Sequence, residues 1–176
     1  MKKIGWTISL CLLASSGSAV ADGLSIGASY GYVNIEDSDA GFTLDASDTG
    51  YKFFGNYTFM NGFGIEGGYV DFGMPDDDFL GQVARIDAEG WSLYGVGSLG
   101  LSESFDLFAK AGVVSWEADS LLDGVPVGTD DGEDFALGIG ARFGRGALGL
   151  RTEFEWFDVD EVDGAWMASV GLEFRF

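Results

Sequence analysis

The sequence predicts an all-β chain: an eight-stranded antiparallel up-and-down transmembrane β-barrel. Three observations lead to this fold class. Large apolar side chains alternate with small or polar ones in eight segments, and short turns alternate with long acidic loops. No stretch after residue 21 approaches the ~18–20 consecutive apolar residues that a membrane-spanning helix needs. Any crossing of a membrane must therefore use strands.

The first four predicted strands cover residues 24–34, 51–59, 63–72 and 91–101. Each has the side-chain period of two that a strand requires. Their large faces carry Tyr30, Phe53, Tyr69 and Trp91, whereas their small faces hold mainly Gly and Ser. One face of each strand is therefore suited to an apolar environment and the other to a narrow interior.

The last four predicted strands cover residues 105–116, 135–143, 148–157 and 166–176. The alternation is clearest in the second of them, where Phe135, Leu137 and Ile139 are separated by Ala and Gly. The final strand places Phe174 and Phe176 on one face and stops there. A soluble chain rarely ends on an exposed aromatic row, whereas a strand that closes a barrel in a membrane meets lipid on that face.

The connections between these strands alternate in length. The short ones contain Asn61-Gly62, Ser102-Glu103-Ser104 and Gly144-Arg145-Gly146. The long ones cover residues 35–50, 73–90, 117–134 and 158–164. The long connections with their flanks carry 22 of the 29 acidic residues. In outer-membrane barrels the long loops face the outside of the cell, so we expect an acidic outer end.

The first 21 residues form a predicted secretory signal peptide, and residues 22–176 form a single predicted barrel domain. A basic start and an apolar run precede Ala19 and Ala21, which give the small-x-small pattern of a cleavage site. Cys11 lies inside the apolar run, which continues past it, so we do not expect lipidation. Without its first 21 residues the 176-residue chain keeps 155, with no cysteine and no disulfide.

The same alternation would fit a soluble barrel that holds its large face inside, as lipocalins do. The interior of an eight-stranded barrel is just wide enough for side chains to fill it, or for one small ligand. The many aromatic residues of the large face would overfill that space. We therefore expect the large face to point outward into lipid.

The small faces carry nine charged residues, which we name the luminal charge cluster: Lys52, Glu66, Lys110, Arg142, Arg151, Glu153, Glu155, Glu173 and Arg175. Isolated charges in a narrow interior are costly, so we expect them to pair. The cluster could be a structural plug or a gate through which small ions pass. We favour the plug, because eight strands leave little open lumen.

The composition argues against several functions. The chain contains no histidine, the side chain best suited to proton transfer near neutral pH, and no catalytic triad can be assembled around its serines. We therefore expect no enzyme and no cofactor. After loss of the signal peptide, 29 acidic and 7 basic residues leave a net charge of −22, which disfavours nucleic acid as a partner.

Acidic runs at residues 76–78 and 130–134 are hard-oxygen clusters of the kind that Ca²⁺ or Mg²⁺ prefers. Neither run matches a twelve-residue calcium loop. We expect a solvated anionic surface that divalent cations bridge loosely to outer-membrane lipopolysaccharide. An acidic surface also suits life in high salt.

Residues 56–69, 148–155 and 171–176 resemble the hairpin, seventh strand and closing strand of the OmpA-like and OmpX-like eight-stranded barrels. The resemblance implies a monomer in the Gram-negative outer membrane, inserted by the barrel-assembly machinery. It also implies that Phe174 and Phe176 belong to the assembly signal. The peptidoglycan-binding domain of full OmpA proteins is not expected, since the sequence stops at the barrel.

Such family members are structural porin-like proteins, adhesion factors or serum-resistance factors. We therefore expect a non-catalytic protein with a structural or surface-interaction role. Two alternatives stay open. One is a narrow porin-like ion-conducting pore, and the other is an adhesin that acts through acidic extracellular loops.

Overall fold

The structure is a computed structural model that describes residues 23–37, 44–59, 62–74, 76–79, 82–122, 125–158 and 164–176. The predicted signal peptide, with Ala19 and Ala21, lies outside these residues. The strands of the described chain are β1 (Leu24–Asp37), β2 (Leu44–Thr58), β3 (Phe63–Asp71), β4 (Asp76–Phe79), β5 (Gln82–Ser102), β6 (Phe105–Leu122), β7 (Val125–Phe143), β8 (Leu148–Asp158) and β9 (Gly164–Arg175). No helix in the described part of the chain is long and apolar enough to cross a membrane.

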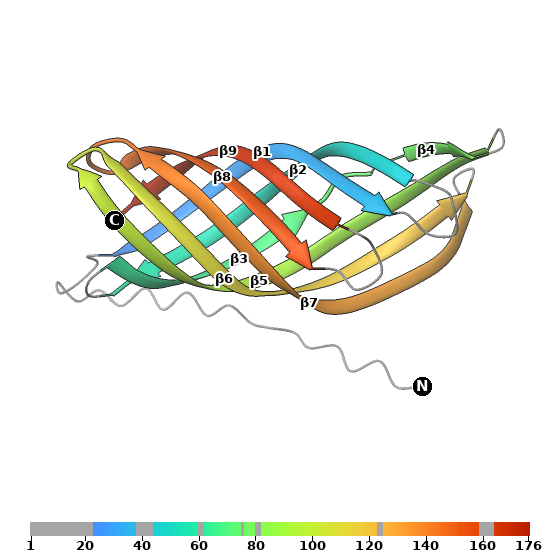
Figure 1. Ribbon diagram of the computed structural model, residues 1–176, viewed down its shortest axis with the longest axis horizontal. Coiled ribbons are helices and arrows are strands. Elements are labelled where there is room, and N and C mark those ends of the chain that lie inside the picture. Colours follow the sequence, from blue (N-terminus) through green and yellow to red (C-terminus); the bar gives the residue numbers. More distant parts are fainter. Residues whose placement is uncertain are drawn as a thin grey trace.

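Eight of these strands form a closed ring in which every strand is antiparallel to both of its neighbours. The order around the ring is β3-β2-β1-β9-β8-β7-β6-β5, and β3 pairs with β5 to close it. β1 and β9 pair from Ser25↔Arg175 to Glu36↔Gly164, so the first and last strands lie side by side (Figure 1). The predicted eight-stranded up-and-down barrel is confirmed.

The large faces of the strands point outward, as the volume argument predicts. Phe63 and Trp91 are 63% and 68% exposed on the outer wall, whereas Val33, Val70 and Met167 are almost fully buried inside. Such an apolar outer band requires lipid rather than water around it. The small faces are bulkier than the sequence analysis suggested, because several aromatic side chains also point into the lumen.

Three of the predicted long loops are largely strand. Residues 44–50 extend β2, residues 82–90 extend β5, and residues 117–122 and 125–134 extend β6 and β7 as a hairpin. The sequence did not reveal these extensions because they lie beyond the apolar band, where no lipid selects an alternating pattern. β4, a ninth strand, also lies in a predicted loop and pairs with β5 from Asp76↔Arg85 to Phe79↔Gln82.

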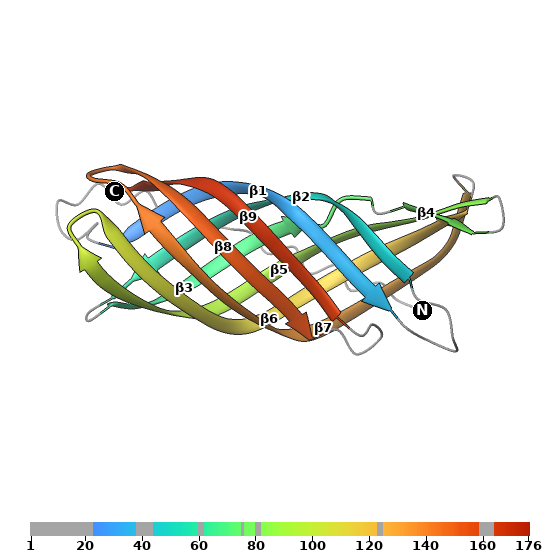
Figure 2. The same cartoon turned by 45° about the horizontal axis from the view of Figure 1, so that its top comes forward.

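The two ends of the barrel therefore differ. The C-terminus lies at the end with the short turns, while β5, β6 and β7 run on beyond the other strands at the opposite end (Figure 1). Figure 2 shows β4 beside these extensions. At the short-turn end, Gly62 and Gly146 have φ values of +78° and +74°, which L side chains rarely adopt. The predicted tight turns depend on glycine at these positions.

Inward glycines make room for the aromatic residues of the lumen. Phe54 lies over its cross-strand partner Gly27, and Phe108 lies over its partner Gly140. A Cβ at either glycine would stand 2.3 Å from the Cζ atom of the facing ring. The glycine face recognised in the sequence is therefore a set of recesses for neighbouring side chains rather than an open channel.

We expect Gly140→Ala to lower the free energy of unfolding by about 1–3 kcal/mol, because the core around the site is already filled. The added methyl would meet the Phe108 ring and also the Thr152 carbonyl oxygen at 2.4 Å, which cannot rotate away. Gly164→Ala is the matched control, because no atom of the described residues lies within 4 Å of its Cβ position. Urea unfolding in detergent micelles, followed by gel mobility, measures both; equal midpoints would contradict the packing described.

Candidate functional site in the barrel lumen

The nine residues of the luminal charge cluster come from six strands and face one interior. β2, β3, β6 and β7 contribute one residue each, β8 contributes three and β9 contributes two. Eight of the nine side chains are at most 7% exposed, and Arg175, at the short-turn end, is 31% exposed. The period of two alone places these side chains on the inner face, and ring closure brings residues distant in sequence together.

Two lysines and two glutamates form the centre of the cluster. Lys52 Nζ lies 2.9 Å from Glu153 Oε1 and 2.5 Å from Glu155 Oε2. Lys110 Nζ contacts both of these glutamates and lies 3.1 Å from Glu66 Oε1. Each lysine therefore bridges carboxylates on β8, and Lys110 also links β8 to β3.

Arg151 connects this centre to the short-turn end. Its Nη1 lies 2.7 Å from Glu66 Oε2, and its Nε donates to Glu153 Oε2 at 2.9 Å. Arg142 Nε lies 3.1 Å from Glu173 Oε2 and its Nη1 donates to Ser98 Oγ at 3.0 Å. The fork geometry of the guanidinium suits such bridging of several carboxylates.

Arg175 completes the cluster at its more exposed end. Its Nε lies 3.5 Å from Glu173 Oε1, and its Nη2 lies 3.7 Å from Asp106 Oδ2. Asp106 was not among the predicted site residues. With it included, the group has five basic and five acidic residues, so their formal charges cancel.

Aromatic rings contact the cations of the cluster, and these rings were not among the predicted site residues. The guanidinium of Arg151 lies between Phe54 and Phe108, with its Cζ 4.2 Å and 4.3 Å from the two ring centroids. Lys110 Nζ lies 4.1 Å from the ring centroid of Tyr94, whose hydroxyl donates to Glu155 at 3.0 Å. Such cation–π contacts stabilise partly desolvated cations. The side-chain period of two places these rings on the charged inner face, so the sequence alone could have identified them as neighbours of the cluster.

The arrangement is that of a satisfied ionic core. Within the described chain each of the nine charges lies within 4 Å of an opposite charge. A few guanidinium nitrogens, including Nη2 of Arg142 and of Arg151, have no hydrogen-bond partner among the described residues. They are suited to ordered water rather than to a substrate.

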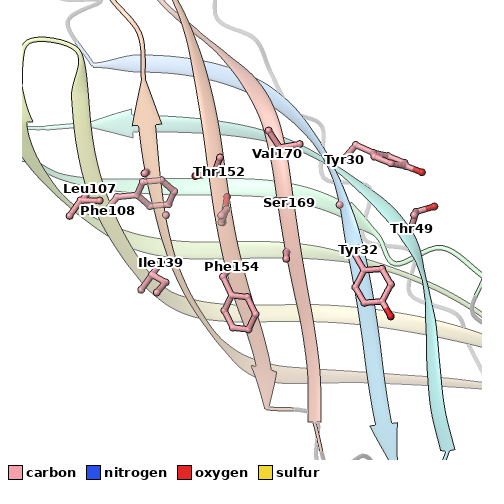
Figure 3. A pocket seen from close by; sticks show the side chains of 15 residues that line it. Tyr30, Tyr32, Thr49, Leu107, Phe108, Ile139, Thr152, Phe154, Ser169 and Val170 are labelled. Carbon is pink, nitrogen blue, oxygen red and sulfur yellow. The ribbon is translucent and has the colours of Figure 1, made fainter.

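A hollow of about 970 Å³ lies on the wall formed by β1, β2, β6, β7, β8 and β9. Figure 3 shows Tyr30, Tyr32, Ile139 and Phe154 around it, and all four are exposed on the outer face. The hollow is wide open and its lining is almost entirely apolar. It is therefore a depression in the lipid-facing wall, with Phe108 and Glu153 of the inner face also along its border.

A second charged region lies beyond the barrel rim. We name the projecting sheet the segment formed by β4 and residues 82–90, 116–122 and 125–134. On its outer face Glu89, Glu117 and Asp131 are direct cross-strand partners in sequence, and Asp71, at the end of β3, continues this row as the partner of Glu89. In a second row, Asp87 is the partner of Asp119. Like charges directly opposite one another are unfavourable, so these rows attract cations.

The acidic run at residues 130–134, for which only loose cation bridging is expected, does not form a metal site among the described residues, and the side chains of residues 76–78 lie outside what the structure describes. Among the described residues no group of three or more acidic side chains is arranged to hold a metal ion. Residues 130–134 alternate between the two faces of β7, which separates neighbouring carboxylates. Loose bridging of the acidic surface to lipopolysaccharide by divalent cations does not require such a site.

The sequence model of the OmpA-like transmembrane domain matches residues 19–158. The chain belongs to this family. As an OmpA-like transmembrane domain it spans the Gram-negative outer membrane, which confirms the predicted location. No curated protein sequence matches the chain.

Solved outer-membrane barrels share the fold of this OmpA-like domain. Neisserial surface protein A has a TM-score of 0.71 at 10% identity, over 88% of this chain and 97% of that one. Ail of Yersinia pestis, in complex with the heparin analogue sucrose octasulfate, has a TM-score of 0.59 at 17% identity, over 88% and 99%. OprG of Pseudomonas aeruginosa has a TM-score of 0.58 at 16% identity, over 88% and 96%. At these identities the likeness establishes the fold alone.

We expect Glu153→Gln to be among the most destabilising single changes in the lumen. Glu153 faces Lys52, Lys110 and Arg151, and removal of its charge leaves buried cations uncompensated. Breaking a buried ion pair in this way costs about 3–5 kcal/mol. Urea unfolding in lipid vesicles measures the loss.

Glu103→Gln provides the matched control for this substitution. Glu103 pairs with Arg145 at the short-turn end, where both side chains are mostly exposed. We expect no measurable change, as is usual for surface ion pairs. A loss at Glu153 no greater than that at Glu103 would show that the luminal pairs do not stabilise the barrel.

The acidic rows should raise the pKa of Asp87, which lies outside the membrane-spanning segment. Partial burial and repulsion by Asp71, Glu89 and Asp119 all raise its pKa. Because the folded-state pKa is above the unfolded one, protonation favours the folded sheet, and this contribution is lost as pH rises through the folded-state value. We expect Asp71→Asn to lower the pKa of Asp87 in a carboxyl NMR titration, and Glu103→Gln to leave it unchanged.

Proposed function

We propose that this OmpA-like domain is a closed, non-catalytic barrel that acts through its outer surface. The observation that carries the proposal is the balanced ionic core: five basic and five acidic residues, held among aromatic rings, occupy the interior at several levels. The interior is thus filled by the protein itself. The part of the molecule left for interaction is the end that projects beyond the apolar band.

The closed lumen is supported by the way the charges are held. A pore lined by charges needs them free to contact passing ions, whereas Lys52, Lys110 and Arg151 each contact two or more carboxylates. The space that the inward glycines Gly27 and Gly140 leave open is filled by the rings of Phe54 and Phe108. Both features favour a structural plug over an ion-selective gate.

A non-catalytic role is supported by the chemistry available. The sequence has no histidine, and the buried glutamates are engaged with cations rather than with a nucleophile. If the protein modified outer-membrane lipid, its expression would change the mass of lipid A. We expect the lipid A mass spectrum to stay the same, and a new species that depends on expression of this chain would overturn this part of the proposal.

The surface role is supported by the charge of the outer end. Ail was crystallised with a polysulfated heparin analogue, which is an anionic ligand. The projecting sheet of this chain presents acidic rows, so an anionic polysaccharide would be repelled. A surface partner of this chain should instead be cationic, or should reach the surface through bridging divalent cations, as lipopolysaccharide phosphates could.

The membrane environment completes the proposal. Phe174 and Phe176 lie 5.1 Å apart between ring centroids on the outer face of the closing strand, 44% and 56% exposed. We propose that they present the assembly signal to the barrel-assembly machinery, and that the protein works as a monomer. Phe176→Ala should then slow insertion into the membrane in cells while leaving spontaneous refolding in detergent unaffected.

We expect the unmodified protein to give no discrete current steps in planar bilayers. Lys52→Ala combined with Glu155→Ala removes one charge of each sign, and with them the ion pairs of Lys52 with Glu153 and Glu155 and of Lys110 with Glu155. The net charge does not change, and the variant should permit small current steps. Discrete conductance of the unmodified protein would overturn the closed barrel and support the porin-like alternative. Heat-modifiable gel mobility confirms that each protein is folded before recording.

A further inference from the structure

The proposed function assigns no role to one edge of the projecting sheet, the edge of β7 that extends beyond its pairing with β8. β7 pairs with β6 along its full length, but its pairing with β8 begins only at Phe135↔Asp158. No described residue pairs with the other edge of β7 between Gly128 and Asp134. The N–H and C=O groups of every second residue in this segment therefore point away from β6, in the geometry that accepts another strand.

The edge without a partner among the described residues has sharp limits. At the tip, Pro126 and a register shift at Val127 interrupt the regular pairing with β6. At the base, β8 takes over as the neighbour. Between these limits the partners Gly128↔Ser120 through Asp134↔Val114 are in regular register, so the edge is straight enough for a short extended peptide.

The charges along the edge indicate what kind of strand it accepts. Asp130, Asp131, Glu133 and Asp134 occupy four of the seven positions and lie on both faces of the strand. Glu117 on β6 is the direct partner of Asp131, which extends the negative field inward from the edge. Apart from Arg85 on β5, no basic residue lies in the described part of the projecting sheet.

The same charges argue against a second copy of this chain as the occupant. Pairing of two β7 edges would bring acidic residues opposite one another, which is unfavourable. Charged edges, proline and bulges are also the devices by which proteins prevent association of identical edges. A peptide with basic side chains at alternate positions meets opposite charge instead.

We infer that the edge Gly128–Asp134 is a binding site for an extended cationic peptide segment, which pairs with β7 as an added strand. Main-chain hydrogen bonds to the edge provide the binding geometry, and the carboxylates of Asp131 and Glu133, which share the outer face, select basic side chains at alternate positions. The inference deepens the proposed surface role and names its partner class. It is independent of lumen closure, which the bilayer recordings test separately.

The test uses the mature protein in zwitterionic detergent micelles and three fluorescent octapeptides: acetyl-(Lys-Val)4-amide, acetyl-(Lys-Pro)4-amide and acetyl-(Glu-Val)4-amide. The Lys-Pro peptide has the charge of the first, but proline cannot donate a hydrogen bond and does not form a central strand. Fluorescence anisotropy measures binding. Infrared spectra with ¹³C-labelled peptide carbonyls report strand pairing directly.

We expect the Lys-Val peptide to bind roughly tenfold or more tightly than the Lys-Pro peptide, with the strand signature only in the former. The Glu-Val peptide should not bind. Equal binding of the two lysine peptides would mean charge attraction without strand pairing and would overturn the inference. So would the absence of binding by the Lys-Val peptide, or self-association of the protein through this edge.

Two charge-reversed double variants locate the site. Asp131→Lys with Glu133→Lys places the change on the edge and should weaken Lys-Val binding roughly tenfold or more. Asp87→Lys with Glu89→Lys makes the same change of net charge on β5, two strands away from the edge. This separation is about one screening length at physiological salt, so the second variant should weaken Lys-Val binding much less. Equal loss of binding in the two variants would contradict a site at the edge. The comparison of the three peptides uses the unmodified protein and therefore does not depend on the folding of either variant.

Discussion

The neutralisation of charge inside a narrow wall of strands is the constraint on which the rest of this structure depends. The outer wall must be apolar because it meets acyl chains, so every charged side chain of the spanning segments has to point inward. Eight strands leave little room there, and water cannot solvate the charges fully. The inner face therefore needs equal numbers of both signs, placed so that each finds its counterpart.

This constraint explains the composition of the inner face. Long charged side chains need neighbouring positions without side chains, and the inward glycines provide them. Gly138, for example, lies directly beside Lys110, where a Cβ would come within 2.6 Å of the lysine side chain. The aromatic rings then fill the remaining space and contact the cations. The glycines, charged residues and aromatic residues of the inner face thus pack together to fill the lumen.

The sequence predicted the barrel and the inward charges because a strand with lipid on one face must alternate apolar and polar side chains. Beyond the membrane, where water surrounds the strands, the sequence predicted less. Residues 82–90 and 125–134 are strands, yet their acidic character resembles that of loops, since water on both faces imposes no alternation. Within the lumen, periodicity placed Phe54 and Phe108 on the charged face, but not above Arg151. That contact depends on ring closure and on the strand register, which no local pattern encodes.

The pairing of β1 with β9 has a consequence for how the protein reaches its membrane. Lys52 and Glu155 are 103 positions apart in the chain, and most contacts of the ionic core join strands that no single hairpin contains. A hairpin entering lipid alone would carry unneutralised charge with it. Electrical balance is reached only when the N-terminal and C-terminal strands meet, so closure and insertion have to occur together, after synthesis of the final strand.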